Sequence, residues 1–420
     1  MTTAPALDQP LCLRRPSLRP WCLRAHLARP ILAAVLRRAP VRVTMPDGTW
    51  LGGAGDDPAA PTLRILRPTA LFERMAHHPK IGLGEGYMAG DWDAAPGTDL
   101  ADALLPFAQR MTTLVPPGLA RWRRVVDRRI PTSTRNTLLG SRTNIEAHYD
   151  LSNELFEAFL DETLSYSSAL FDRSRPLAEQ SLEEAQAAKI EAVLDTAGVC
   201  EGSRVLEIGT GWGSLAIAAA RRGAQVTTIT LSREQAELAR ERIAAAGLAD
   251  RISVRLQDYR EVQGQFDAIV SVEMIEAVGE EYWPTYFRAI DDLLAPGGAA
   301  AIQAILMSHE RYLATRRSYG WIQKHIFPGG LIPSAEAIEE TTAQHTTLRV
   351  TSTSRFGRDY AETLRRWRQT FLAEWPRIAG AGFDETFRRR WEFYLAYCEA
   401  GFAADYLDVA QIRLERGVAA

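Results

Sequence analysis

The sequence has few cysteines and lacks any long apolar run. Cys12, Cys22, Cys200 and Cys398 lie far apart and form no CxxC pair, which excludes a zinc ribbon and a disulfide framework. No stretch of about 18 uninterrupted apolar residues occurs, and arginines interrupt the N-terminal apolar residues, so we predict neither a spanning helix nor a signal peptide. We therefore expect a cytoplasmic protein that meets the inner face of the plasma membrane only peripherally.

Lysine is nearly absent as well. Of 49 basic residues only three are lysines, namely Lys80, Lys189 and Lys324. A GC-rich genome, which encodes most basic positions as arginine, would give the same composition. Residues 1–45 and 110–142 each carry eight arginines against one aspartate, so each window has a charge of +7 and the rest of the chain has −17. This basic N-terminal region favours lipid headgroups over nucleic acid, because few aromatic residues are present for base stacking. We expect salt-sensitive binding to anionic vesicles.

The composition fits a two-domain globular protein. The chain has 420 residues, of which 46% are apolar and 24% charged, and this excludes a disordered or collagen-like protein. Residues 41–66 alternate apolar and polar positions around a Pro-Asp-Gly turn, which indicates short strands in a small α+β lobe. The polar segment 132–144 is typical of a linker. We expect residues 1–140 to form a lipid-contacting N-terminal domain and residues 141–420 to form the catalytic domain.

The second part of the chain alternates between helices and buried strands. A helix predicted over residues 182–196 ends at Gly198, because glycine adopts a left-handed C-cap at little cost. Another helix begins at Ser232, with Gln235 completing a capping box. The predicted strands are residues 203–209, 225–230, 252–257, 266–272 and 299–305. This order predicts an α/β fold with a doubly wound parallel sheet.

A glycine-rich loop, EIGTGWG, joins the first predicted strand to the next helix. Gly209, Gly211 and Gly213 allow a tight turn against which a cofactor can lie. A dinucleotide fingerprint needs glycine where this chain has Ser214, and it needs an acidic residue about 20 positions later that is absent here. The loop therefore argues against NAD. With Asp258 after a later strand, it favours the nucleoside-binding edge of an S-adenosylmethionine methyltransferase.

Nine ordered blocks between about residue 81 and residue 415 resemble the cyclopropane fatty acid synthase family. The resemblance implies a Rossmann-like, class I S-adenosylmethionine methyltransferase domain. Within the family, EIGTGWG, VSVEMIEAVG and AIQAI are most similar to the branch that makes the 10-methylene precursor of 10-methylstearic (tuberculostearic) acid. The blocks are HYDLSNELF, TLSYSSALF, VLEIGTGWG, TLSREQ, LQDYR, VSVEMIEAVG, IFPGGLIPS, FGRDYAETLRRW and YCEAGF.

The resemblance implies that S-adenosylmethionine binds to small, aromatic and acidic residues at the strand ends. Small side chains and backbone amides suit its polar tail, and an aromatic ring with a carboxylate or amide suits adenine. For single members such as Tyr166 and Gln235, core packing and capping remain the alternative. The implied set is Tyr166, Ser167, Gly209, Gly211, Gly213, Thr230, Gln235, Asp258 and Tyr259.

The resemblance also implies a bound bicarbonate that acts as the base. Its expected ligands are the side chains of Glu276 and Tyr360, backbone groups near Ser168 and Ile305, and Gln303. Ser168 and Gln303 stand where other members have cysteine and histidine, and Ala277 also replaces a histidine. Gln303 can donate a hydrogen bond but carries neither a proton nor a charge to the site.

Two glutamates and one cysteine in these blocks need separate assignments. Glu276 follows a strand in an apolar segment, so burial should disfavour its charged form, although capping of a helix start is the alternative. For Glu273, contact with the cofactor and capping remain equally open. Cys398 matches a cysteine once regarded as a nucleophile in the family. We expect it to be a buried apolar residue, because methyl transfer from a sulfonium to an alkene needs no thiol.

The resemblance implies methylation of the double bond of an oleoyl chain in a phospholipid, giving a 10-methylene acyl product. A partner reductase that uses flavin or NADPH would then give 10-methylstearate, and the enzyme itself is expected to be a homodimer. The main alternative is a cyclopropane synthase acting on the same double bond. A catalytically silent cofactor-binding subunit is a further alternative from another functional class. The expected partners include the membrane surface and exclude nucleic acid.

Overall fold

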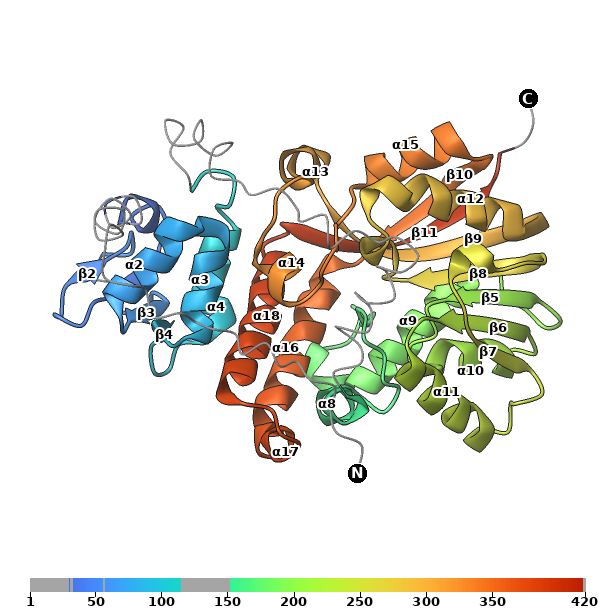
Figure 1. The fold of residues 1–420 in the computed structure, drawn as a ribbon, viewed down its shortest axis with the longest axis horizontal. Helices are drawn as coiled ribbons and strands as arrows, with labels where there is room; N and C mark the ends of the chain where they lie inside the picture. The colour runs from blue at the N-terminus through green and yellow to red at the C-terminus, as the bar shows by residue number, and fades with distance from the viewer. Residues whose placement is uncertain (1–29, 31–32, 56, 115–151, 418–420) are drawn as a thin grey trace. The chain divides into compact units, whose positions relative to one another are not determined.

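The computed structural model describes residue 30 and residues 33–55, 57–114 and 152–417 (Figure 1). The chain divides into two compact units, one of Met1–Val126 with Glu385–Phe393, and one of Asp127–Asp384 with Tyr394–Ala420. The predicted domain boundary near residue 140 lies outside the described residues, as does most of both basic windows. Each unit is described below by itself.

The larger unit is built on a seven-stranded sheet of order β10-β11-β9-β8-β5-β6-β7. Strands β5 to β9 pair in parallel, which confirms the predicted doubly wound sheet. Two antiparallel strands that we did not predict, β10 and β11, extend one edge. The strands are β5 (Arg204–Ile208), β6 (Gln225–Thr230), β7 (Ile252–Leu256), β8 (Phe266–Val272), β9 (Leu294–Met307), β10 (Leu348–Arg355) and β11 (Leu407–Arg416).

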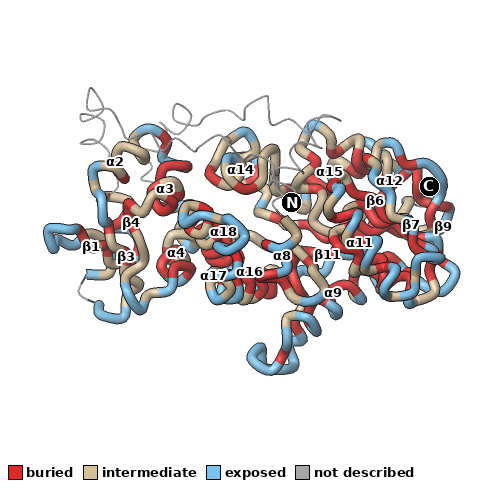
Figure 2. The backbone as a smooth tube through the Cα atoms, turned by 60° about the horizontal axis from the view of Figure 1, so that its bottom comes forward, coloured by how far each residue is buried: buried red, intermediate tan, exposed pale blue. Residues whose placement is uncertain are grey.

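Helices cover both faces of this sheet, and each face has its own apolar core. One core joins α9, α10 and α11 to the sheet through residues such as Leu194, Leu215 and Ala239. The other joins α12 and α15 to the sheet through residues such as Phe287, Ile290 and Ile338. Figure 2 shows β6 and β9 as mostly buried between these layers. Burial on both faces explains why the inner strands β5, β8 and β9 are rich in apolar residues.

The two helices predicted at residue 182 and at Ser232 begin close to the predicted positions. The predicted helix over 182–196 is α9, which Gly198 ends in a left-handed conformation with φ 72°. The helices are α8 (Asn153–Phe159), α9 (Leu182–Ala197), α10 (Ser214–Arg221), α11 (Arg233–Ala245), α12 (Trp283–Leu293), α13 (His309–Thr315), α14 (Trp321–His325), α15 (Ala335–His345), α16 (Gly357–Ala373), α17 (Trp375–Gly380) and α18 (Glu385–Ala403). Short 3-10 turns occupy Leu177–Glu179, Tyr259–Glu261, Ile275–Ala277 and Glu280–Tyr282.

Two local predictions need correction. Ser232 caps α11 by accepting a hydrogen bond from the Gln235 amide, but the Gln235 side chain does not return the bond that a capping box requires. Instead the Thr230 hydroxyl accepts the bond from the Ser232 amide. The strand predicted to start at residue 299 begins earlier, at Leu294, because Leu294 already pairs with Phe266. The register then shifts, and regular pairing continues from Ala299, which lies opposite Ala268.

The smaller unit contains a four-stranded sheet of order β2-β1-β3-β4 and confirms the small β-containing lobe. The glycine-rich segment 81–93 forms most of helix α3 and the start of β4. In α3 a Cβ on Gly82 would lie 2.5 Å from the Arg74 carbonyl carbon, so glycine allows the two helices α2 and α3 to approach closely. The elements are β1 (Arg42–Thr44), β2 (Trp50–Leu51), β3 (Thr62–Ile65), β4 (Trp92–Ala94), α2 (Pro68–His77), α3 (Pro79–Met88) and α4 (Leu100–Ala108).

The first half of α18 completes this smaller unit. Arg389 is buried and donates hydrogen bonds to the carbonyl oxygens of Tyr87 (2.5 Å) and Trp92 (3.1 Å) and to Asp93 (3.1 Å). Its guanidinium lies 4.0 Å from the centre of the Tyr87 ring. The ring of Phe393 packs against the same aromatic pair. A segment from near the C-terminus thereby fills the core of the N-terminal unit.

No helix in the described part of the chain combines the length and the apolar character that crossing a membrane requires.

We expect Arg389→Met to lower the free energy of unfolding by about 3 kcal/mol, because it leaves buried carbonyl groups and Asp93 without their donor. The neighbouring Arg388→Met serves as a matched control. Arg388 pairs with Glu385 and Glu392 nearer the surface, so its loss should cost about 1 kcal/mol or less. Urea unfolding followed by tryptophan fluorescence measures both variants, and equal losses would contradict the assigned role of Arg389.

Candidate active site

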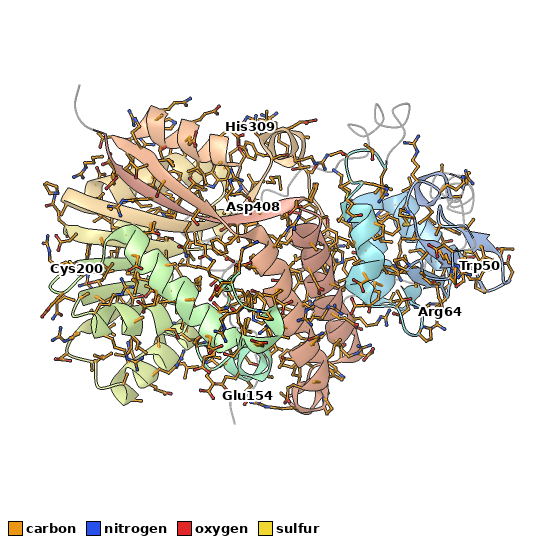
Figure 3. The ribbon with its side chains drawn as sticks, turned by 180° about the vertical axis from the view of Figure 1, so that it is seen from behind. Trp50, Arg64, Glu154, Cys200, His309 and Asp408 are labelled. Carbon is orange, nitrogen blue, oxygen red and sulfur yellow. The ribbon has the colours of Figure 1, made fainter. Side chains whose placement is uncertain are left out.

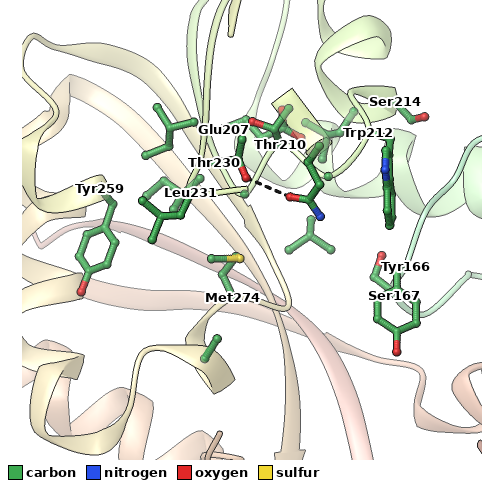
Figure 4. A pocket seen from close by; sticks show the side chains of 18 of the residues that line it. Tyr166, Ser167, Glu207, Thr210, Trp212, Ser214, Thr230, Leu231, Tyr259 and Met274 are labelled. Carbon is green, nitrogen blue, oxygen red and sulfur yellow. Dashed lines mark hydrogen bonds between the residues drawn. The ribbon is translucent and has the colours of Figure 1, made fainter. Parts of the chain in front are cut away.

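A cavity opens at the carboxyl ends of the parallel strands in the larger unit (Figure 4). Residues that follow β5, β6, β7 and β8 line it, and these strands flank the point where the strand order reverses. Doubly wound sheets bind ligands at this point, because the loops on either side run in opposite directions and leave a crevice. Eight of the nine predicted cofactor residues line the cavity: Tyr166, Ser167, Gly209, Gly211, Thr230, Gln235, Asp258 and Tyr259.

The glycine loop after β5 forms one wall of this cavity. Gly209 has φ 100°, and a Cβ there would lie 2.8 Å from Cγ of Met274, so both the backbone and the space require glycine. Gly213 is the predicted residue that does not line the cavity. It has φ 91°, caps α10 and faces Ala239 at 3.4 Å, so its role is to start the helix close to α11.

Thr230 and Gln235 form a polar pair in the cavity wall. The Thr230 hydroxyl donates to Oε1 of Gln235 at 2.9 Å, which Figure 4 marks with a dashed line. Both residues are buried. This bond fixes the orientation of the Gln235 amide and leaves its nitrogen as a hydrogen-bond donor for a ligand.

Asp258 and Tyr259 lie at the other end of the lining. Arg260 holds the Asp258 carboxylate through both oxygens, with Nε 2.7 Å from Oδ1 and Nη2 2.6 Å from Oδ2. Any ligand contact by this carboxylate is therefore shared with a guanidinium. Burial raises the pKa of Tyr259 to about 12, so its ring enters the cavity as a neutral aromatic group.

Tyr166 and Ser167 precede α9 on the opposite side. The hydroxyl groups of Tyr166 and Tyr394 are 2.8 Å apart, and the Tyr166 ring packs 5.2 Å from that of Trp367. Ser167 accepts a hydrogen bond from Nζ of Lys189 at 2.7 Å. Tyr166 thus lines the cavity, as predicted, and also packs in the aromatic core, which was the alternative role considered for it.

Two charged residues of the cavity were missed by the sequence analysis. Burial raises the pKa of Glu207 to about 8 and lowers the pKa of Lys189 to about 8. Oε2 of Glu207 is buried, and within the described residues it has no hydrogen-bond partner. Two signals were available: Glu207 is an acidic residue inside an apolar strand just before the glycine loop, and Lys189 is one of only three lysines.

Beside the cavity, three of the candidate residues meet at the carboxylate of Glu273. Oε1 of Glu273 accepts hydrogen bonds from the Ser168 amide (2.9 Å) and from Nε2 of Gln303 (2.9 Å). Oε2 accepts a hydrogen bond from the Tyr360 hydroxyl at 2.7 Å. Three of the five predicted catalytic residues therefore converge on Glu273. Glu273 caps no helix in the described part of the chain, and it is not among the residues that line the cavity.

Glu276 and Ile305, the other two predicted catalytic residues, form a separate contact. Oε1 of Glu276 accepts a hydrogen bond from the Ile305 amide at 2.5 Å, whereas its buried Oε2 has no partner within the described part of the chain. Burial, and then the charge of Glu273, raise the pKa of Glu276 to about 8. This confirms that the site disfavours the charged form, and Glu276 is predominantly a neutral acid at pH 7.

This arrangement does not fit a bicarbonate held by the predicted ligands. The Ser168 amide, Gln303 and Tyr360 already donate to Glu273, and the Ile305 amide already donates to Glu276. A second anion would also lie beside the Glu273 carboxylate and be repelled by it.

Cys398 has no activated thiol. It is half-buried rather than fully buried as predicted, and withdrawal from water raises its pKa to about 12. A thiol with that pKa remains protonated near neutral pH and is a poor nucleophile.

Comparisons with known proteins agree with the fold and with the sequence blocks. Residues 138–412 match the family described as mycolic acid cyclopropane synthetase. The chain is 50% identical over 395 residues to the tuberculostearic acid methyltransferase UfaA1 of Mycobacterium tuberculosis, covering 93% of this chain and 91% of that relative. It is 33% identical over 392 residues to the cyclopropane-fatty-acyl-phospholipid synthase of Escherichia coli, covering 90% of this chain and 96% of that relative.

Solved structures give the same result. The crystal structure of mycolic acid cyclopropane synthase CmaA1 complexed with SAH and CTAB matches with a TM-score of 0.59 and 29% identity, over 66% of this chain and 98% of that chain. Coclaurine N-methyltransferase bound to N-methylheliamine and SAH shares the fold, with a TM-score of 0.59 at 18% identity, over 80% of this chain and 99% of that chain. With the class I S-adenosylmethionine methyltransferase fold in its larger unit, the chain belongs to the mycolic acid cyclopropane synthetase family.

Proposed function

We propose that this protein transfers a methyl group from S-adenosylmethionine to the double bond of an oleoyl chain in a phospholipid and yields a 10-methylene acyl chain. One observation carries the proposal: the cofactor cavity at the strand ends lies beside a hydrogen-bonded carboxylate, in a chain that is half identical to a relative named a tuberculostearic acid methyltransferase.

The cavity offers groups that match each part of S-adenosylmethionine. Oε2 of Glu207 can accept a hydrogen bond from the ammonium of the methionine tail, because it is buried, lines the cavity and has no partner within the described residues. Thr230 and Gln235 supply a hydroxyl and an amide suited to the ribose, and Tyr259 supplies an aromatic face suited to adenine.

The cofactor supplies an electrophilic methyl group on a sulfonium sulfur, and the protein must make a poor nucleophile, an alkene, react with it. Close positioning and exclusion of water serve this purpose. The positive charge that develops on the acyl chain needs stabilisation. The rings of Tyr360 and Phe402, 4.5 Å apart, and those of Tyr166 and Trp367 form an electron-rich aromatic cluster next to Glu273, and such faces attract cations.

The product depends on which atoms rearrange before the proton is lost. Direct loss of a proton from the new methyl group closes a cyclopropane ring. A hydride shift between the two former alkene carbons, followed by the same loss, leaves a methylene group. The greater identity to the tuberculostearic acid relative than to the cyclopropane-fatty-acyl-phospholipid synthase supports the methylene product, and a cyclopropane product is the second candidate.

The remaining partners follow from the chemistry of this product. A methylene group is still unsaturated, so its conversion to 10-methylstearate needs a separate reductase that uses flavin or NADPH. The acyl chain lies in a bilayer, so the enzyme must dock at the membrane surface, and the arginine-rich N-terminal region is the natural contact. We extend the proposal to a homodimer acting at the inner face of the plasma membrane. Bicarbonate as the base came from the resemblance alone and is not included.

The proposed activity is tested with purified protein, S-adenosylmethionine and dioleoyl phospholipid vesicles. We expect released acyl chains to gain the mass of one CH₂ and to show the olefinic proton signals of an exocyclic methylene group by NMR. Upfield cyclopropyl signals at the same mass would show that the product is a cyclopropane and not a methylene group. An unchanged acyl mass would contradict the proposed function.

The proposed role of Glu207 is tested by Glu207→Gln. We expect the affinity for S-adenosylmethionine to fall at least about tenfold, because a charge-assisted hydrogen bond to the ammonium is lost. Isothermal titration calorimetry measures this change. The affinity for 5′-methylthioadenosine, which lacks the amino-acid tail, should stay the same, and Glu201→Gln on the surface serves as a control. An equal loss of affinity for both ligands would show that Glu207 does not bind the amino-acid tail.

A further inference from the structure

We propose that the Glu273 carboxylate is itself the base that removes the proton from the methylated acyl chain, so that this enzyme needs no accessory anion. This inference rests on the proposed function, because it assigns the last step of that reaction.

Three hydrogen-bond donors surround the Glu273 carboxylate. Ser168 lies before α9, Gln303 lies in β9 and Tyr360 lies in α16, and all three are buried. They meet the two oxygens of Glu273 at 2.7 to 2.9 Å. Three donors from three separate elements around one carboxylate form a preorganised anion site, and the anion in it belongs to the chain.

Glu273 lies next to the cofactor cavity along the chain. Its chain neighbours Val272 and Met274 both line the cofactor cavity. Residue Glu273 is half-buried, whereas its three donors are buried. A base must act on the reacting carbons next to the cofactor, and Glu273 lies between two residues of the cavity wall.

The groups around Glu273 are held so that they donate hydrogen bonds to it. Gln411, opposite Gln303 in the β9–β11 pairing, donates from Nε2 to Oε1 of Gln303 at 3.1 Å and to the Lys189 carbonyl oxygen at 3.1 Å. The Gln303 amide nitrogen therefore faces Glu273. Neither an amide side chain nor a backbone amide can give up a proton here, and burial raises the pKa of Tyr360 well above its ordinary value. Glu273 is the group of this cluster that can accept one.

The backbone of Glu273 has an unusual conformation. Glu273 has φ 52°, in the left-handed region that favours glycine, and among the described residues only Leu164 and Asp405 share this property outside glycine. Local preference therefore opposes a glutamate at this position, and the surrounding structure holds it there. Such residues concentrate at functional sites.

The step balances without another reactant. Methyl transfer turns the sulfonium into a neutral thioether and leaves a positive charge on the acyl chain. For the methylene product, a hydride first shifts between the two former alkene carbons, so that the positive charge lies on the methylated carbon. A C–H bond of the transferred methyl group then breaks. Its electron pair becomes the second bond of the new carbon–carbon double bond, and its proton moves to an oxygen of Glu273, which becomes a neutral carboxylic acid. Loss of that proton to solvent restores the carboxylate for the next turnover.

The first variant is Glu273→Gln, which preserves size and hydrogen-bonding capacity but cannot accept the proton. We expect kcat to fall at least about 100-fold, since general bases contribute 10² to 10⁴. The Kd for S-adenosylmethionine should change less than about threefold, because no interaction with the cofactor is removed. Loss of such an interaction, worth about 1.4 kcal/mol, would raise the Kd about tenfold. Glu241→Gln, on the exposed face of α11, is the matched control and should keep the wild-type rate.

The second variant, Glu273→Gly, removes the carboxylate at a position where the backbone suits glycine, so the protein should remain folded. It also leaves the three donors open. We expect it to be inactive in degassed, bicarbonate-free buffer and to regain activity with added bicarbonate, which a merely structural role of Glu273 does not predict. Wild-type rates in either variant without bicarbonate would overturn the inference. Inactivity of the wild-type protein toward the vesicles would instead overturn the proposed function.

Discussion

The free-energy cost of withdrawing charged groups from water is the constraint on which this site depends. An ionised group loses several kcal/mol of solvation on burial unless the protein supplies partners. Glu273 has three donors, and Lys189 has the Ser167 hydroxyl together with the attraction of the surrounding carboxylates. Glu207 and Glu276 each keep one buried oxygen without a partner within the described residues, and their pKa values rise accordingly. Burial raises the pKa of all three glutamates, and at Glu273 the three hydrogen bonds oppose that rise.

The sheet provides this separation. Parallel strands deliver the glycine loop, the Thr230 pair and the Glu273 segment to one edge, and the antiparallel β11 adds Gln411 beside Gln303. Strand β11 also fixes α16, because Asp408, labelled in Figure 3, accepts hydrogen bonds from the Gly357 amide (3.0 Å) and from Arg355 (2.9 Å). Helix α16 carries Tyr360. The added edge strands therefore support the candidate catalytic cluster as well as the fold.

The sequence predicted the parts of this structure that local pattern determines. The strands at 225–230 and 266–272 have the predicted bounds, because most of their residues are apolar or β-branched, as is typical of buried strands. The role of Glu273 could not be predicted, because its donors lie 105, 30 and 87 residues away along the chain. Strands β10 and β11 escaped prediction for a related reason. They follow the alternating helix–strand series, and they join the sheet only in the folded protein, where β11 pairs with β9 and β10 pairs with β11.

A carboxylate built into the chain also changes what the enzyme depends on. A base that belongs to the protein is present at every turnover, whereas a bound anion must be captured from solution. The most direct measurement is the initial rate of lipid methylation by the wild-type protein in bicarbonate-depleted buffer, with bicarbonate then added back. The account predicts the same rate before and after addition. A rate that falls on depletion and recovers with bicarbonate would contradict it.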